Sequence, residues 1–285
     1  MASLTNLNND MKSFIFILTI LFAMSSCSSN EVSDGNNVQY RDIEFYLDGL
    51  GITQTRASAL AETSLSEVFL ADWNGSTYAQ TKCLSREDFA TPTIRLSYGN
   101  HDVYFVGHCS SSADYNTNES TARFDDVKDT FVGSIHLDVN ASSDTEQNVE
   151  LDRCVYYLQF VAEDEVPMNA AIARIEVVGY YNTMCWLDGY ARGSSFTLSR
   201  DIMIDPSAEV TSWGVYGFTR EETDMVSASI TFYDDQLNEL SRQSKDDVPV
   251  TRKYITNLKG NLFARKTPLT IMVDTSWEGE YDIEL

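Results

Sequence analysis

The sequence is poor in basic residues, histidine, cysteine and proline. Its 285 residues include 20 Lys and Arg against 43 Asp and Glu, with 3 His, 5 Cys and 5 Pro, and the formal net charge is −23. A nucleic-acid-binding protein needs a Lys/Arg surface to neutralise phosphates, so nucleic acid is excluded as a partner. The same deficit disfavours attachment to anionic lipid by charge alone. With 14 Gly and 5 Pro, collagen-like and low-complexity chains are excluded as well.

The apolar content is sufficient for a folded protein. Hydrophobic residues make up 43% of the chain and aromatic residues 12%, which excludes a disordered chain despite the acidity. At about 100–200 residues per domain, the length suggests two domains, each able to bury its own core.

Long apolar runs are also missing. The one candidate covers residues 14–23 and is preceded by Lys12 and Ser13. It is too short to cross a hydrocarbon core, which needs about 20 residues, but it has the dimensions of a signal-peptide h-region. Met11 is a plausible true start, because Met11 and Lys12 would form the usual short basic n-region.

The sequence Met-Ser-Ser-Cys at 24–27 follows this run and resembles a bacterial lipobox. The resemblance implies cleavage before Cys27 and acylation of Cys27, with chains such as palmitate. Two or more acyl chains anchor a protein stably, because each buried CH₂ contributes about 0.8 kcal/mol. We therefore expect a signal peptide over 1–26, and a lipidated Cys27 with a flexible polar tether over 27–38. The alternative is an ordinary secretory signal with a coincidental Cys.

Beyond the tether, the dominant signal is alternation of apolar and polar residues. It occurs at 40–47, 102–106, 134–139, 172–177, 229–233, 269–273 and 281–285. Short strands separated by turn clusters are typical of antiparallel sandwiches. The polar stretch 140–148 is the best boundary, so we expect one β-sandwich over 39–148 and a second over 149–285. Helical candidates are few, and residues 57–69 could form a short helix.

Four cysteines remain besides Cys27, namely Cys83, Cys109, Cys154 and Cys185. An exported protein permits disulfides, and four Cys allow three pairings. No CxxC spacing indicates a zinc ribbon or a redox motif. Two of the four lie in apolar strands, where Cys behaves as a small hydrophobe, which favours free buried thiols but leaves bridges open.

Catalytic motifs are absent from the sequence. It contains no GxSxG, P-loop, GxGxxG or HExxH. His108 and Cys109 suggest a Cys/His pair, but neighbours on a strand point to opposite faces. Acidic clusters at 125–129, 163–165 and 246–247 do not match a calcium loop and are interpreted as solvated turns. We therefore predict no enzyme activity, no metal and no cofactor.

The tryptophans allow two interpretations. Trp73, Trp186, Trp213 and Trp277 could include a sugar-stacking platform or could be ordinary core residues. Their placement among alternating strands favours the core.

Three pieces of sequence carry a family resemblance. The first is 229–234, a polar turn, and then VPVTRKYITNLKGNLF at 248–263 before the last apolar strand. The second is the apolar stretch 149–160 with Arg153, and the third is Gln-Thr-Arg-Ala at 54–57. With the lipobox, these pieces resemble the fimbrillin-type surface lipoproteins of Bacteroidetes, and most closely the fimbrillin-associated anchor family.

The resemblance implies two transthyretin-like antiparallel β-sandwich domains after a lipoprotein signal peptide. It further implies a non-enzymatic fimbrium (pilus) subunit or anchor for cell adhesion, tethered by its lipid to the outer membrane and joined to other fimbrial subunits by β-strand exchange. In the shaft-forming branch a trypsin-like protease cleaves after an Arg, and Arg56 matches that position. An ordinary loop Arg is the alternative, and anchor subunits stay uncut.

Two further alternatives remain open. The terminal alternation at 281–285 is either a donor strand or a closing edge strand. The function alternative is a surface glycan-binding lipoprotein of a polysaccharide uptake system, which an exposed Trp73 or Trp186 would serve.

Overall fold

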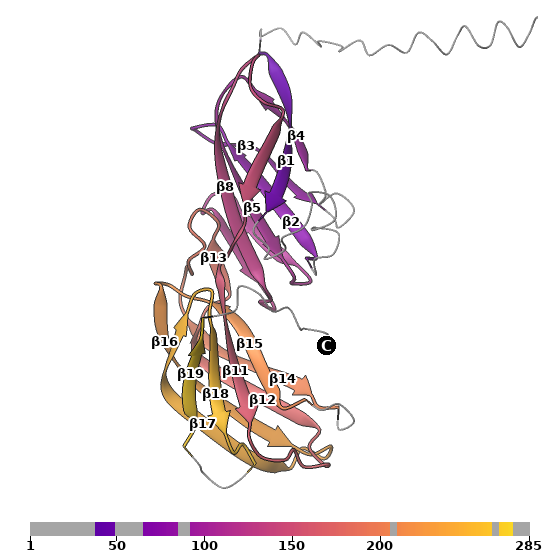
Figure 1. The fold of residues 1–285 in the computed structure, drawn as a ribbon, viewed down its shortest axis with the longest axis vertical. Coiled ribbons are helices and arrows are strands. Elements are labelled where there is room, and N and C mark those ends of the chain that lie inside the picture. Colours follow the sequence, from indigo (N-terminus) through magenta and orange to yellow (C-terminus); the bar gives the residue numbers. More distant parts are fainter. Residues whose placement is uncertain (1–37, 49–64, 85–91, 206–209, 264–267, 276–285) are drawn as a thin grey trace, which may run out of the picture. The chain divides into compact units, whose positions relative to one another are not determined.

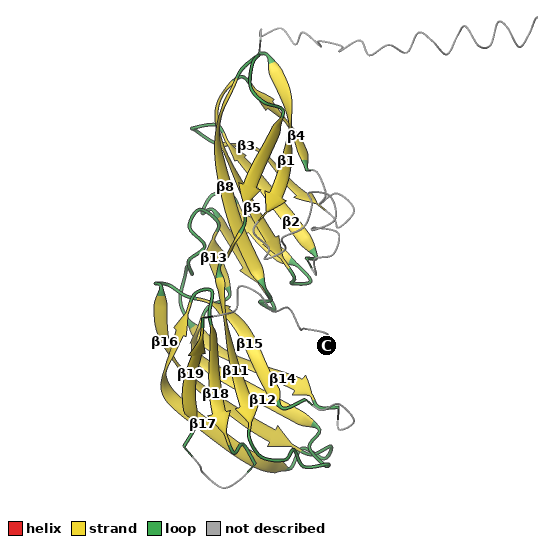
Figure 2. Cartoon of the chain, viewed as in Figure 1, coloured by secondary structure: helices red, strands yellow, loops and turns green. Residues whose placement is uncertain are grey.

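The computed structural model describes residues 38–48, 65–84, 92–205, 210–263 and 268–275. Every regular element in these ranges is a β-strand (Figure 2), so the predicted all-β fold is confirmed. The strands belong to one compact unit, Tyr40–Leu285. In the described part of the chain, no helix is long and apolar enough to cross a membrane.

The strands from β1 to β10, apart from β6 and β7, form two sheets (Figure 1). Sheet A has the order β4-β1-β9, with bounds Thr93–Ser97, Tyr40–Asp48 and Glu146–Glu150. Sheet B has the order β10-β8-β5-β2-β3, with bounds Asp152–Arg153, Thr130–Val139, Gly99–His108, Glu67–Trp73 and Tyr78–Leu84. We call sheets A and B together the first sandwich.

Alternation in the sequence explains how these sheets enclose a core. On β1, Ile43, Phe45 and Leu47 are buried, while the residues between them are more exposed. The Phe45 ring meets the Phe105 ring of sheet B edge to face, with centroids 5.1 Å apart. One buried cluster contains side chains from both sheets, so sheets A and B pack face to face.

The strands from β11 onward, apart from β13, form the second sandwich. Sheet D has the order β15-β11-β18-β19, with bounds Ser212–Phe218, Val155–Ala162, Ile255–Gly260 and Thr270–Asp274. Sheet E has the order β14-β12-β16-β17, with bounds Phe196–Met203, Ile172–Tyr180, Thr223–Tyr233 and Glu239–Thr251. The main buried cluster of the molecule lies between them.

The two sandwiches repeat one strand order. β1 lies between antiparallel β4 and parallel β9, just as β11 lies between antiparallel β15 and parallel β18. In the facing sheets, the order β3-β2-β5-β8 corresponds to β14-β12-β16-β17. The two parallel pairings add to the antiparallel pattern expected from the sequence. The two sandwiches share the order in which their strands pair, not a repeated pattern of residues, so the sequence does not show this repeat.

A small fifth sheet, sheet C, connects the sandwiches. It has the order β13-β7-β6, with bounds Thr183–Cys185, Thr121–Phe124 and Ala113–Asn116. The β6–β7 hairpin is inserted between β5 and β8, and β13 is inserted between β12 and β14. Phe69, Ala71 and Val106 of sheet B belong to the same buried cluster as the core of the second sandwich.

One expectation from the sequence is wrong in part. The helix expected at 57–69 overlaps β2, where Glu67 to Phe69 are extended; residues 57–64 lie outside the described residues. The run from Val68 to Ala71 is buried throughout, because β2 lies inside sheet B and carries packing on both faces.

The cysteine prediction is confirmed for two of the four residues, because Cys83 and Cys109 are not buried. No disulfide joins Cys83, Cys109, Cys154 and Cys185, all of which lie in the described part of the chain. Cys154 and Cys185 are buried as expected, but Cys83 is exposed, because it lies on the edge strand β3 of sheet B.

Candidate functional site

The middle strand of sheet A, β1, is the first candidate site. Its first half pairs with β4, from Tyr40 opposite Ser97 to Glu44 opposite Thr93. Its second half pairs with β9, from Glu44 opposite Glu146 onward. β1 therefore fills a slot between two strands, and without it both neighbouring edges would be unpaired.

The inner face of β1 closes the core of the first sandwich. Ile43, Phe45 and Leu47 are at most 4% exposed. Burying an aliphatic or aromatic side chain of this size stabilises a protein by about 1.5–3 kcal/mol, so these three contribute on the order of 5–9 kcal/mol. A strand that left this slot would have to be replaced by another with apolar residues at alternate positions.

Several residues predicted as sites lie outside the described residues. Cys27 and Arg56 are among them, as are Trp277 and the terminal stretch 281–285. In the sequence, Arg56 lies between the end of β1 and the start of β2. Cleavage after Arg56 would separate β1 from all later strands.

The buried tryptophans confirm the core interpretation. Trp186 is 1% exposed and Trp213 is 3% exposed. The Trp186 Nε1–H donates a hydrogen bond to the Tyr78 hydroxyl at 3.0 Å. Trp73 is partly exposed and meets the Tyr78 ring edge to face at 5.1 Å. Trp186 and Trp213 are therefore structural residues, not exposed stacking surfaces.

His108 and Cys109 face different surroundings, as expected for neighbours on an extended chain. The His108 ring lies edge to face with the Phe124 ring and 3.0 Å from the Tyr115 hydroxyl. Cys109 instead packs against the core between sheets A and B. Burial lowers the pKa of His108, although Glu67 opposes that shift. His108 thus belongs to the connection between the sandwiches rather than to a nucleophile pair.

Sequence reasoning missed a buried pair, Asp72 and His101, and its partly buried neighbour Ser97. His101 Nδ1 lies 2.7 Å from Asp72 Oδ1, and both residues are at most 2% exposed. His101 Nε2 lies 2.9 Å from the Ser97 carbonyl oxygen and 3.3 Å from its hydroxyl. A carbonyl only accepts, so Nε2 donates there and has no lone pair to act as a base. The group fastens β2 to β5.

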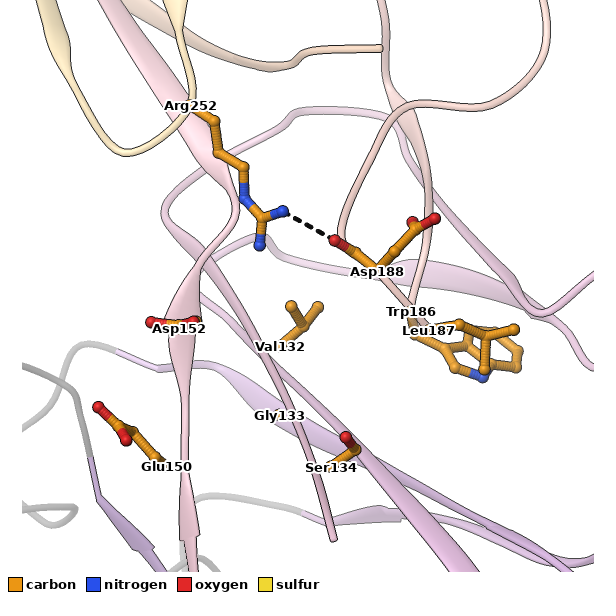
Figure 3. A pocket seen from close by; sticks show the side chains of 9 residues that line it. All are labelled: Val132, Gly133, Ser134, Glu150, Asp152, Trp186, Leu187, Asp188 and Arg252. Atoms are coloured by element: carbon orange, nitrogen blue, oxygen red, sulfur yellow. Dashed lines mark hydrogen bonds between the residues drawn. The ribbon is translucent and has the colours of Figure 1, made fainter. Parts of the chain in front are cut away.

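A pocket of about 310 Å³ is the second candidate site (Figure 3). It is lined by Val132, Gly133, Ser134, Glu150, Asp152, Trp186, Leu187, Asp188 and Arg252. These residues come from β8, from the β9–β10 region, and from the segments after β13 and β17. The pocket thus combines residues from both sandwiches, and no local motif could have predicted it.

Two of the carboxylates in the pocket already have partners. The Asp188 carboxylate accepts from Arg192 Nη2 at 2.5 Å and from the Tyr190 N–H at 3.0 Å. The Asp152 carboxylate lies 3.1 Å from Lys253 Nζ. These contacts fix both acidic side chains at the wall of the pocket.

Residues 111–285 match a family described as a family of unknown function, DUF6562. The chain belongs to this family. No curated protein matches the chain.

Several solved structures share the fold. A candidate polysaccharide-binding protein of Bacteroides thetaiotaomicron is 9% identical, with a TM-score of 0.55, over 82% of this chain and 96% of its own. A candidate adhesin of the same species is 9% identical, with a TM-score of 0.51, over 84% of this chain and 97% of its own. A fimbrial assembly protein of Parabacteroides distasonis is 10% identical, with a TM-score of 0.50, over 86% and 98%. The resemblance to fimbrillin-type proteins is therefore confirmed at the level of the fold.

Proposed function

We propose that this protein is a non-enzymatic fimbrial subunit or anchor that acts in cell adhesion. In this proposal Cys27 is lipidated and tethers the chain to the outer membrane, where the sandwiches are exposed at the cell surface. Its partners are other fimbrial subunits. Support comes from the position of β1 in sheet A and from the fold shared with a fimbrial assembly protein.

The proposed assembly reaction is β-strand exchange at the β1 slot. Loss of β1 would leave β4 and β9 unpaired and would expose the core that Ile43, Phe45 and Leu47 cover. A strand from another subunit could then supply backbone hydrogen bonds and alternate apolar side chains. Cleavage after Arg56 would permit this exchange, whereas an uncut anchor would keep its own β1. We retain the stretch 281–285 as a candidate donor.

In this proposal the first and second sandwiches are separate domains. The sequence suggested a boundary between residues 148 and 149. Because β9 and β10 pair with β1 and β8, we now place the proposed boundary at Cys154, directly before β11.

The N-terminus and intact mass of the native protein test this proposal. Both would be measured on protein from the cell envelope and from sheared fimbriae. An acylated Cys27 start in both fractions supports a permanent anchor and contradicts cleavage at Arg56. An unlipidated Ala57 start in the fimbriae supports a polymerising subunit.

Variants sharpen the test. If the Ala57 start is found, Arg56→Ala should leave the chain on the membrane as a monomer. Arg242→Ala is the matched control, because Arg242 is an exposed residue of β17, far from β1 in the sequence. Absence of the protein from the fimbrial fraction, combined with an unmodified Cys27, would refute both the anchor and the subunit.

A second candidate function is glycan binding at the cell surface. It is favoured by the fold shared with the candidate polysaccharide-binding protein of Bacteroides thetaiotaomicron. Among the described tryptophans, Trp73 is the one with partial exposure, so Trp73→Ala tests a stacking role. Unchanged polysaccharide binding in that variant would remove the tryptophan platform from this candidate.

A further inference from the structure

Arg252 is a buried cation with incomplete hydrogen bonding. It is 9% exposed, and its Nη1 donates to the Asp188 carbonyl oxygen at 2.8 Å. Its Nε is buried and has no hydrogen-bond partner. The guanidinium carbon lies 4.9 Å from the centre of the Tyr190 ring. Leaving a buried donor unsatisfied is costly, so the position of the Arg252 side chain is maintained at a cost in stability.

Glycine allows the guanidinium to reach this position. Gly189 has φ +75°, and a Cβ at that residue would lie 2.9 Å from Arg252 Nη2 and 2.9 Å from Cys154 Cβ. Gly133, which lines the pocket, also permits a close approach. A Cβ there would lie 2.5 Å from the Glu150 carbonyl oxygen, so Gly133 lets the chain at Glu150 approach β8. The shape of the pocket therefore depends on two glycines: Gly189 leaves room for the Arg252 side chain, and Gly133 leaves room for the backbone of Glu150.

The guanidinium extends into the space that the other lining residues surround (Figure 3). Glu150 and Asp152 lie across this space, on the side of the β9–β10 region, and the side chain of Leu187 is 49% exposed. The pocket thus presents carboxylate acceptors, one strong donor group and an apolar side chain.

This combination selects a class of ligand. With Lys253 beside Asp152 and Arg192 beside Asp188, the three carboxylates and Arg252 belong to a site of balanced charge. Such a site favours neither an anion nor a cation. A neutral ring with several hydroxyl groups can donate to carboxylates and accept from Arg252 at the same time. The volume of about 310 Å³ lies at the lower end of the range for ligand pockets.

We propose that this pocket binds one sugar ring of a neutral glycan. Glu150 and Asp152 accept hydrogen bonds from its hydroxyls, Arg252 donates to its oxygens, and Leu187 covers its apolar face. This inference rests on the second candidate function, glycan binding, and names a site for it. It does not depend on strand exchange or on lipidation of Cys27. A failed cleavage test would leave it standing, and its own failure would leave the assembly proposal standing.

The test is a titration of the full mature chain in detergent with single sugars, followed by saturation-transfer NMR. The neutral probes are D-glucose, D-galactose, D-mannose and N-acetyl-D-glucosamine, and the acidic probe is D-glucuronate. We expect at least one neutral probe to bind with a Kd of about 1 mM, a weak affinity suited to one ring. D-Glucuronate should bind more weakly than D-glucose.

Glu150→Gln is the decisive variant, because Glu150 is exposed and its change should leave the fold intact. We expect it to weaken sugar binding about tenfold, the effect of losing a hydrogen bond to a charged group. The control is Glu146→Gln, an exposed residue of the same strand that does not line the pocket. Arg252→Lys, checked by thermal unfolding, should weaken binding at least as much because it loses the planar fork.

Three results would overturn the proposal. The first is that no neutral probe binds the wild-type chain at about 50 mM, well above the expected Kd. The second is that Glu150→Gln binds like the wild type or that Glu146→Gln weakens binding equally. The third is that D-glucuronate binds more tightly than every neutral probe.

Discussion

The first and second sandwiches share a strand order but differ in where their central strand lies in the chain. β1 is the first described strand and is followed by β2, whereas β11 lies between β10 and β12. One cut between β1 and β2 would sever β1 from all later strands, but β11 would need a cut on each side. The position of β1 between β4 and β9 is topologically the same as the position of β11 between β15 and β18. The place of each strand in the chain therefore decides which sandwich could exchange its central strand.

The sandwiches also differ at one edge. In sheet D, β19 pairs with the outer side of β18, from Lys259 opposite Thr270 to Ile255 opposite Asp274. In sheet A, β9 corresponds to β18, and none of the described strands pairs with its outer side. β19 itself carries exposed apolar side chains, Met272 and Val273. The additional strand therefore extends the second sandwich without giving it a fully polar edge.

The largest expected effect separates the two central strands. Phe45→Ala in β1 should destabilise the first sandwich by about 3–5 kcal/mol, and Leu158→Ala in β11 should destabilise the second by about 2–5 kcal/mol, because both side chains are fully buried. Hydrogen exchange read strand by strand would show which sandwich loses protection. Asp42→Asn, an exposed change on β1, is the control. A loss below about 1 kcal/mol for Phe45→Ala would contradict a closing role for β1.

A smaller effect should appear at the contact between the sandwiches. Trp186→Phe removes the hydrogen bond to Tyr78 and part of a ring that packs 5.1 Å from the Phe69 ring. We expect a loss of about 1–3 kcal/mol. We expect calorimetry to show one transition for the wild type and separate unfolding of the two sandwiches in the variant. Trp73→Phe is the control at a partly exposed ring. A single, unshifted transition would show that Trp186 does not couple them.

The smallest effect should depend on pH and should belong to His108. Burial lowers its pKa below the ordinary value of 6.5, against the opposing influence of Glu67 and the Ser110 carbonyl. The folded state therefore prefers neutral His108. This contribution to stability is complete above pH 6.5 and is lost as the pH falls through the lower pKa of the folded state.

Urea unfolding measured from about pH 8 to about pH 5 would test this, because His is the side chain that titrates there. His108→Gln should flatten the loss of stability on the acidic side. The control is His136→Gln, since His136 is 66% exposed and pairs with Asp102 at the surface. If the free energy of unfolding of His108→Gln fell with decreasing pH as steeply as that of the wild type, the pH dependence would belong to other groups.

The local alternation of apolar and polar residues predicts where strands lie, but it does not predict which strands or side chains they contact. Alternation at 40–47 and 102–106 indicated β1 and β5, because one face of each is buried and the signal is local. β2 was misassigned in part, since a strand buried on both faces loses its alternation. The pairing of Asp72 with His101 depends on the register of β2 against β5, which is a long-range property.

Arg153 and Arg252 illustrate the same limit. Both lie in stretches that carry the family resemblance, at 149–160 and 248–263. Their roles became visible only from contacts far along the chain. Arg153 binds the Asp129 carboxylate with two hydrogen bonds of 2.7 and 2.9 Å, and Arg252 reaches the Asp188 carbonyl. A sequence motif marks such residues without naming their partners.

The short passage between the sandwiches has a mechanical consequence. Only Cys154 separates β10 from β11, and its backbone N–H donates to the Thr130 carbonyl at 2.9 Å. β7 and β13 join the sandwiches a second time, from Thr121 opposite Cys185 to Arg123 opposite Thr183. A tensile force that pulled sheets A and B away from sheets D and E would load this second connection together with the covalent chain. The molecule would therefore transmit tension without first stretching a slack linker.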